Sequence, residues 1–276
     1  STYPLEVVSA ARLVKANPGL KGEELLALAQ DKDWEPSVKA MLGFPGVLEM
    51  MDEQLDWTTK LGDAFLAQQA DVMDSVQRLR NKAYAQGNLT TSKEQVVKVE
   101  PQTKIIIVEP ASPTVVYVPV YDPFVVYGPW WYPAYPPYYY YPRRYYITRG
   151  FTFGFFTEIV WLGWGIWYWD WPSRYVYINI NYYNDFGRRY YRRPPPPPRQ
   201  VYHVDRTNPV WQHDPIHRKH VEYRGTTTIQ RYDPQQRPAP KITAPLMLDP
   251  KVGTADKMKT VPLTGSVDNR EIFKPG

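Results

Sequence analysis

The sequence of 276 residues contains no cysteine and only four histidines. Without cysteine, the chain can form neither a disulfide framework nor a thiolate nucleophile. It also lacks a dinucleotide-binding fingerprint, a phosphate-binding loop, an HExxH helix and a GxSxG elbow. No pair of carboxylates stands in an apolar setting, because Glu158 is isolated and Asp122 lies in an expected turn. We therefore expect that the protein is not an enzyme and that it uses no cofactor.

The net charge of the chain is small and unevenly placed. Lysine and arginine number 33 against 28 aspartates and glutamates, a net charge of +5, and much of the excess lies in arginine clusters between residues 143 and 218. Arginines interleave with tyrosines at 143–146 and 188–193, as they do where basic grooves hold single-stranded nucleic acid. No nucleic-acid motif accompanies these runs, and the net charge is low for that purpose. We therefore expect no nucleic-acid partner.

Aromatic residues and proline are abundant, with 23 Tyr, 10 Trp and 29 Pro, far above ordinary usage. They are concentrated in residues 114–146, where proline removes backbone donors and prevents a long helix. Valine and tyrosine alternate through residues 115–121, which predicts a strand, and Pro119 within it predicts an edge strand or a bulge. So many rings favour surface recognition or assembly as much as core packing.

Residues up to Gly87 have the apolar spacing of helices. Asn17–Gly19 is expected to end the first helix, and Pro36 suits the first position of a later one. The longest helix is predicted from about Asp56 to Ala85, with Gly87 at its C-terminal cap. These helices are expected to form a bundle in a domain of their own, residues 1–88.

After the helices, the period of the sequence changes from helical to strand-like. A hairpin that turns near residues 100–102 is expected to lead into Ile105–Val108, which is apolar on both faces and should be a central strand. The strand at 115–121 is then expected to pair beside it in a small antiparallel sheet.

Residues 151–171 are the hardest segment to interpret. They have about the length of a bilayer-spanning helix, but Glu158, three glycines and many tryptophans fit that poorly. Trp161, Trp164 and Trp167 align at helical spacing, while Trp161 and Trp167 also share a face at strand spacing. We favour buried or assembly-facing β structure over membrane insertion.

Residues 174–184 give a clearer strand pattern. Val176 and Ile178 alternate with Tyr177, Asn179 and Asn181, so one face is apolar and the other carries an Asn/Tyr ladder. Such a ladder pairs within a fold or stacks between copies of a chain, as in cross-β packing.

The last third of the chain reads as a tail. Five prolines at 194–198 form a stiff spacer, and the sequence beyond is polar and proline-rich with little periodicity. The predicted fold class is therefore α+β, with an N-terminal helical bundle (1–88), an aromatic and proline-rich antiparallel β domain (89–193) and a largely extended tail (194–276).

All four histidines lie between residues 203 and 220. Asp214 and the following proline predict a helix start, which would place His217 and His220 on one helical face. His213, Asp214 and His217 are the candidate ligands of a zinc or copper ion, because imidazole and carboxylate bind these metals. The alternative is that Asp214 caps the helix and the histidines form local hydrogen bonds or are solvated.

Several motifs together resemble one known family, an exported bacterial family known only as domain of unknown function 3300. The motifs that carry the resemblance are Trp34-x-Pro36-Ser37-Val38-Lys39, the run from Val116 to Pro123, Val126-Tyr127-Gly128-Pro129-Trp130, and Trp211-x-His213-Asp214-Pro215-x-His217-Arg218. The resemblance implies an exported protein, with a secretion signal and a further helical stretch before Ser1, and it brings no activity. Residues 151–169 and His220 depart from the family, which is richer in glycine and alanine in the former and has glycine at the latter.

Two classes of function remain after these exclusions. The first is a non-catalytic structural protein of the periplasm, the outer surface or the extracellular space, which self-assembles into a homo-oligomer or a fibre. The second is a module that binds cell-wall glycans through exposed rings; a membrane role ranks behind both. The residues expected to carry assembly or binding are Tyr117, Tyr121, Trp130, Trp131, Tyr132, Tyr135, Trp161, Trp164, Trp167, Tyr177, Asn179 and Asn181.

Overall fold

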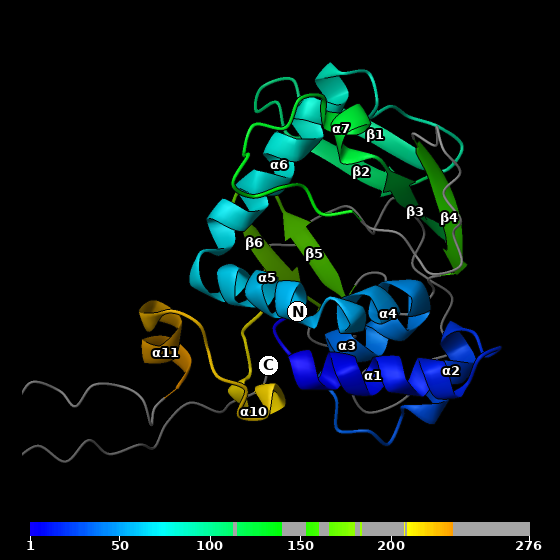
Figure 1. Ribbon diagram of the computed structural model, residues 1–276, viewed down its shortest axis with the longest axis vertical. Helices are drawn as coiled ribbons and strands as arrows, with labels where there is room; N and C mark the ends of the chain where they lie inside the picture. Colours follow the sequence, from blue (N-terminus) through cyan, green and yellow to red (C-terminus); the bar gives the residue numbers. More distant parts are fainter. Residues whose placement is uncertain are drawn as a thin grey trace, which may run out of the picture. The chain divides into compact units, whose positions relative to one another are not determined.

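The computed structural model describes residues 1–112, 115–139, 153–159, 166–179, 183, 207 and 209–233 (Figure 1). All of them belong to one compact unit, Ser1–Arg237. The described part combines helices with small antiparallel strand pairs, so the fold class is α+β, as predicted. The predicted independence of residues 1–88 and 89–193 stays a prediction about folding, which a fragment can test.

The first 85 residues form a series of helices. Proline occupies the first turn of several of them, where the missing N–H breaks no hydrogen bond. Gly87, with φ of 74°, follows the last helix as the predicted cap. The elements are α1 (Pro4–Ala16), α2 (Gly22–Leu28), α3 (Pro36–Ala40), the 3₁₀ turn η1 (Met41–Gly43), α4 (Pro45–Glu53), α5 (Leu55–Ala67) and α6 (Gln69–Ala85).

The apolar core of these helices is formed within the first 48 residues. Its aromatic members are Tyr3, at the start of α1, and Trp34, which precedes α3. Its aliphatic members are Val7, Ala10, Ala11, Val14, Leu25, Leu26, Ala29, Val38, Leu42 and Leu48. Trp211, far along the chain, packs against this core, so the helices are not closed by their own residues alone.

The long helix predicted from Asp56 to Ala85 is two helices. The backbone of Gln68 (φ −148°, ψ 57°) separates α5 from α6. Its N–H donates the last hydrogen bond of α5, to the Ala64 carbonyl, and its own carbonyl accepts the first hydrogen bond of α6, from Val72 N–H. Within α5, Leu61 is exposed, while Gly62 is buried. Gly62 faces the first residues closely: a Cβ atom there would lie 2.4 Å from the Ser1 carbonyl oxygen. A close approach of backbones decides which face of α5 is covered.

The predicted hairpin near residues 100–102 is confirmed. It joins β1 (Gln95–Val99) to β2 (Ile106–Pro110) in an antiparallel pair. The expectation that the next strand, β3 (Val115–Tyr121), pairs beside β2 was wrong. Helix α6 reaches β2 at Ile106 instead, where Gln77 bonds both the N–H (3.0 Å) and the carbonyl (3.2 Å) and Arg80 also donates to the carbonyl (2.8 Å).

The strand β3 pairs instead with β4 (Phe153–Ile159), and β5 (Trp167–Asp170) pairs with β6 (Tyr175–Ile178), both antiparallel. Residues 153–159 and 167–170 are therefore strands, as favoured, whereas 160–165 lie outside the described residues. Pro119 stands opposite Phe155 in a two-stranded sheet, which has a free edge that suits a proline. Over the described ranges, no helix has the length and apolar character of a membrane span.

Residues 209–233 pack against α1, α5 and β6, which come earlier in the chain; we call residues 209–233 the return segment. Its first residues pair antiparallel beside β6, with Ile178 N–H donating to the Pro209 carbonyl (2.9 Å) and Trp211 N–H to that of Val176 (2.7 Å). Two short helices follow, α10 (Pro215–Arg218) on α1 and α11 (Thr226–Tyr232) on α5 (Figure 1). This part of the tail is thus docked rather than extended.

Candidate functional site

An aromatic surface begins directly after β3. Asp122 ends the strand and caps α7 (Pro123–Tyr127) by accepting from Phe124 N–H at 2.9 Å, and Pro123 fixes the first helical residue. Because α7 buries Pro123 and Val126, it turns Phe124 and Val125 outward. Gly128, with φ of 72°, then ends the helix and directs the chain into the tyrosine- and proline-rich loop.

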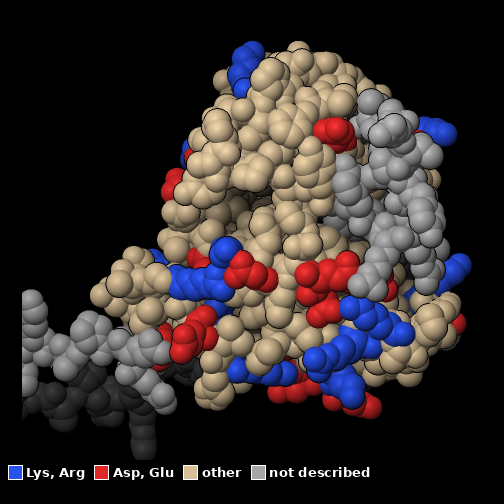
Figure 2. Space-filling model, viewed as in Figure 1, with Lys and Arg blue, Asp and Glu red and all other residues tan. Residues whose placement is uncertain are grey.

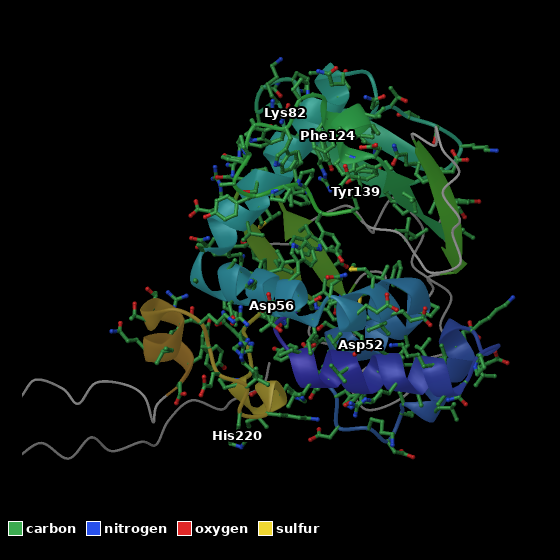
Figure 3. The ribbon with its side chains drawn as sticks, in the orientation of Figure 1. Asp52, Asp56, Lys82, Phe124, Tyr139 and His220 are labelled. Atoms are coloured by element: carbon green, nitrogen blue, oxygen red, sulfur yellow. The ribbon has the colours of Figure 1, made fainter. Side chains whose placement is uncertain are left out.

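The loop that follows contributes most of the exposed rings. Tyr132, Tyr135 and Tyr139 are exposed, and Tyr135 is 77% accessible. Tyr139 lies beside Phe124, with ring centroids 6.5 Å apart, and both project near α7 (Figure 3). We define the aromatic surface by its five exposed residues: Phe124, Val125, Tyr132, Tyr135 and Tyr139.

The two tryptophans of this loop support the surface from behind. Trp130 and Trp131 are half-buried, with centroids 4.6 Å apart, and Trp130 Nε1 donates to the Tyr135 carbonyl at 2.7 Å. The Lys82 ammonium of α6 lies 4.2 Å from the Trp131 ring centroid, a cation–π contact that fixes the loop against that helix. The indoles therefore hold the loop, and the tyrosines face solvent.

The other predicted assembly residues divide between packed and undescribed positions. Tyr117 and Tyr121 are half-buried in β3, and the Tyr121 hydroxyl is hydrogen-bonded to that of Tyr127. Burial raises the pKa of both hydroxyls of this pair. Trp167 and Tyr177 are half-buried in β5 and β6, and Asn179 is fixed by a bond from its N–H to the Ile166 carbonyl. Trp161, Trp164 and Asn181 lie outside the described residues.

Charge is distributed unevenly over the face drawn in Figure 2. Lysine, arginine, aspartate and glutamate gather over α1, α4 and α5, where Lys15 pairs with Asp52 (2.6 Å) and Arg224 with Asp56 (2.9 Å). The part of the same face that α6 and α7 form carries few charged side chains. The aromatic surface therefore lies in the less charged half of that face.

The predicted helix start at Asp214 is confirmed, because its carboxylate accepts from Ile216 N–H at 2.9 Å. The expectation that His217 and His220 share a helical face was wrong. Helix α10 ends at Arg218, since Lys219 and His220 both have positive φ, so His220 lies beyond it.

The three candidate metal ligands each have a partner within the protein. His213 Nε2 lies 2.9 Å from the Tyr223 hydroxyl, and His217 Nδ1 donates to Glu6 Oε1 at 2.9 Å. Burial and the nearby Arg218 charge lower the pKa of His213 to about 4, so its ring is neutral at neutral pH. Among the described residues, no group of three or more histidine, aspartate or glutamate side chains is arranged for a metal ion. These contacts favour capping and local hydrogen bonding.

Sequence reasoning missed a buried polar interface between the return segment and α1 and α5. Arg218 is only 1% exposed, and its guanidinium donates to Asp63 Oδ1 of α5 (2.6 Å) and to the carbonyls of Thr2, Val221 and Glu222. The same group lies 4.2 Å from the Tyr223 ring centroid. This arginine is saturated by its surroundings, which indicates a structural fastening.

Two buried carboxylates complete this interface. Glu6 of α1 accepts from His217 and from Glu35 N–H (2.7 Å), and it forms an ion pair with Lys219 (3.4 Å). Glu35 caps α3 through Ser37 N–H and accepts from the Tyr183 hydroxyl at 2.8 Å. Burial, followed by the Glu35 charge, raises the pKa of Tyr183. Neither carboxylate is free for acid–base chemistry, because each is enclosed by donors of the chain itself.

Comparison with known proteins places the chain in a family. A model of the family described as "Protein of unknown function (DUF3300)" matches residues 1–213. The chain belongs to this family. It is 40% identical over 169 residues to the uncharacterized protein YacH of Escherichia coli (strain K12), a match that covers 50% of this chain. The chain spans about a quarter (27%) of the length of that relative. No solved structure matches the chain.

The DUF3300 match contains the aromatic surface and the helical core but ends at His213. Helices α10 and α11, with Arg218 and its partners, lie beyond the matched residues. The aromatic surface is thus built wholly from residues that the family model covers, whereas most of the return segment is not.

Proposed function

We propose that this protein is a non-catalytic structural protein of the cell envelope or the extracellular space, which self-associates through the aromatic surface. Export rests on the resemblance of its motifs to an exported family. The non-catalytic role is supported by the enclosure of Glu6, Glu35 and Asp63, the most buried carboxylates of the helical part, by donors from the chain itself.

The observation that carries the proposal is the exposure of several rings on α7 and on the loop that follows it. A large aromatic side chain buries roughly 150–250 Å² when it is covered, and monomers rarely expose apolar patches beyond a few hundred Å². Phe124 of α7 and Tyr135 of the following loop are 50% and 77% exposed, and Tyr132 and Tyr139 of that loop are exposed as well. Covering these rings with a second copy removes that apolar area from water, which drives association.

The half-buried tryptophans add a second argument. Trp130 and Trp131 are held in place by Tyr135 and Lys82, so the exposed tyrosines are presented by an ordered backbone. A preformed contact surface loses less conformational entropy on binding than a flexible one. Tyrosine also suits such a role, because its ring is apolar while its hydroxyl can bond a partner.

The direct test is a variant that removes exposed rings only. Tyr132→Ser combined with Tyr135→Ser is expected to shift the protein from a large species to a monomer in sedimentation velocity at micromolar concentration and neutral pH. Ile216→Ser is the matched control, because Ile216 is 78% exposed but lies on α10. Retention of the large species by the tyrosine variant, or its loss in the control, would contradict the proposal.

A second function, glycan binding, is favoured by one other observation. Trp169 of β5 is 47% exposed and stacks nearly parallel (18°) on Trp171, with centroids 5.7 Å apart. A flat, open indole face suits the apolar face of a sugar ring. If glycan binding is the main role, purified cell-wall glycan should retain the wild type and release Trp169→Ser, while Tyr132→Ser with Tyr135→Ser should still bind. Equal retention of the wild type and Trp169→Ser would dismiss this alternative.

A further inference from the structure

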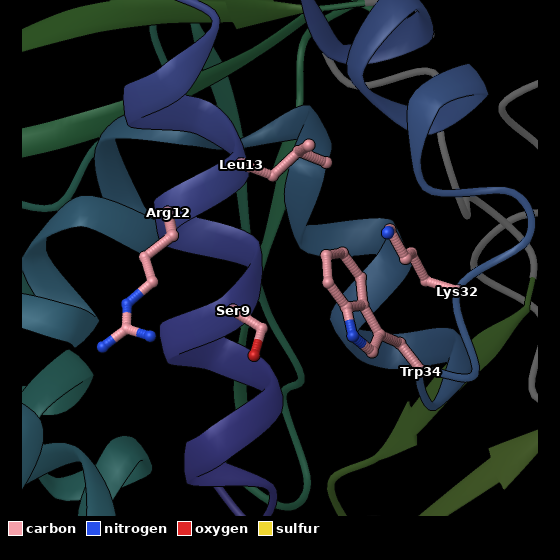
Figure 4. A pocket seen from close by; sticks show the side chains of 5 residues that line it. All are labelled: Ser9, Arg12, Leu13, Lys32 and Trp34. Atoms are coloured by element: carbon pink, nitrogen blue, oxygen red, sulfur yellow. The ribbon is translucent and has the colours of Figure 1, made fainter.

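An open pocket lies between α1 and the loop that precedes α3. Its volume is about 450 Å³, within the roughly 300–1,000 Å³ of small-molecule sites. Five residues line it: Ser9, Arg12, Leu13, Lys32 and Trp34 (Figure 4). It is separate from the aromatic surface, which α7 and residues 132–139 form.

The floor of this pocket is apolar, and its charged groups are the cations Arg12 and Lys32. Leu13 and the Trp34 indole form the floor, although Trp34 is only 9% exposed. Figure 4 shows Ser9 and Leu13 projecting from α1 toward Trp34, and the Lys32 side chain extending toward the same indole. Arg12 leaves α1 in the opposite direction and forms the outer rim.

The donors of the pocket have no partners among the residues that the structure describes. Neither Lys32 nor Arg12 forms a side-chain ion pair or hydrogen bond there, and the Trp34 indole N–H has no acceptor. Ser9 already donates its hydroxyl proton to the Leu5 carbonyl at 2.8 Å, so only its lone pairs remain. The pocket therefore offers two cations and an indole N–H to a ligand that accepts hydrogen bonds.

The carboxylates near the pocket weaken its attraction for an anion, but the charges that line the pocket are positive. Asp31 and Asp33 flank Lys32 in the sequence and are exposed, where water screens them. The next cation along α1, Lys15, is already paired with Asp52 at 2.6 Å. Arg12 and Lys32 are thus the charges that line the pocket itself.

We propose that this pocket binds an anionic saccharide, a sugar ring that carries a carboxylate or a phosphate. The apolar face of the ring covers Leu13 and the accessible edge of Trp34, and the anionic group accepts from Lys32, with Arg12 at the rim. Ring hydroxyls accept from the indole N–H and donate to Ser9 Oγ. The proposal does not depend on self-association, because none of these residues belongs to the aromatic surface.

Isothermal titration of the whole chain can test the site with three probes: trigalacturonate for a carboxylate, glucose 1-phosphate for a phosphate, and neutral maltotriose. At least one anionic probe is expected to bind with one-to-one stoichiometry and to weaken as sodium chloride is added. Binding of one anionic probe alone identifies the anionic group. Absence of binding by both, or equal binding of maltotriose, overturns the proposal.

Variants locate the site on the surface. Lys32→Gln is expected to lower the affinity about tenfold, the effect of losing one charge-assisted hydrogen bond, and Arg12→Gln less, because it lies at the rim. Lys32 and Arg12 are both exposed, so these changes leave the fold intact. Lys93→Gln is the matched control, since the Lys93 side chain is 91% exposed on another part of the chain. Equal affinity of the wild type and Lys32→Gln overturns the assignment.

Discussion

The return-segment interface buries charged side chains, whereas the aromatic surface exposes apolar rings. At the first, charged groups are buried and each finds a partner: Arg218 meets Asp63, and Glu6 meets His217 and Lys219. At the second, rings that could be buried are left partly open to water, as at Phe124 and Tyr135. A region whose buried charges are paired is complete within one chain, whereas one that exposes several rings is suited to a partner.

Substitutions in the two regions should also have different effects, on stability at the return-segment interface and on association at the aromatic surface. Removing one member of a saturated buried pair leaves its partner without compensation, so large losses of stability are expected there. Exposed rings contribute little to the folding of a single chain, so their removal should change association and leave stability nearly unaltered. The expected effects on stability therefore fall in a fixed order from one region to the other.

The largest change removes the return segment altogether. A fragment of residues 1–88 is expected to give a helical circular dichroism spectrum and a cooperative melt, because its apolar core lies within the first 48 residues. It should melt below the full chain, since Trp211 no longer covers that core. Its carboxylates become hydrated instead of buried and unpaired, so the fragment still folds. An unfolded fragment would show that residues 1–88 share one core with the rest of the chain.

A single substitution at Arg218 is expected to be costly. Arg218→Ala leaves Asp63 buried without its partner, and breaking a buried pair in this way costs about 3–5 kcal/mol of unfolding free energy. Lys60→Ala is the control, because its pair with Asp56 on the same helix is exposed and contributes little to stability. Urea unfolding of both variants measures the difference. Equal losses would mean that the return segment is only loosely attached.

Acid should weaken the same interface through His213. Its folded pKa, about 4, lies below the ordinary value of 6.5, because burial disfavours the charged ring. As the pH falls through 6.5, the unfolded chain takes up a proton that the folded chain does not, so stability declines and the decline levels off below about pH 4. The expected loss is on the order of 2 kcal/mol. Unfolding of the wild type and His213→Gln between pH 8 and 4 isolates this group; parallel curves would dismiss it.

The smallest effect on stability is expected at the aromatic surface. Tyr132→Ser with Tyr135→Ser should change the unfolding free energy by no more than about 0.5 kcal/mol, since both side chains are exposed. The measurement is urea unfolding at a concentration where both proteins are monomeric. A loss above about 1 kcal/mol would place these rings in the core and remove them as a contact surface.

Local features could be predicted from the sequence. The break at Asn17, the proline at the start of α3 and the hairpin near residue 101 depend on neighbouring residues only. The capping roles of Asp122 and Asp214 also follow from short-range chemistry, because a carboxylate two residues before an N–H can accept from it.

Contacts between distant residues could not be predicted. Arg218 and Asp63 are 155 positions apart, and Tyr183 and Glu35 are 148 apart, so no periodicity links them. The pairing of β3 with β4 rather than β2 was missed for the same reason, since side chains of α6 hydrogen-bond the backbone N–H and carbonyl of Ile106 in β2. For the aromatic surface, the sequence prediction named Tyr132 and Tyr135 but not Phe124, Val125 or Tyr139, because composition does not show which side chains face water.

The most direct test of the central claim is light scattering by the unmodified 276-residue chain over a range of micromolar concentrations at neutral pH. The chain mass is 32.2 kDa. If the aromatic surface is a contact between copies, the weight-average mass should exceed this value and rise with concentration. A mass of 32.2 kDa at every concentration would contradict self-association and leave the rings to another ligand.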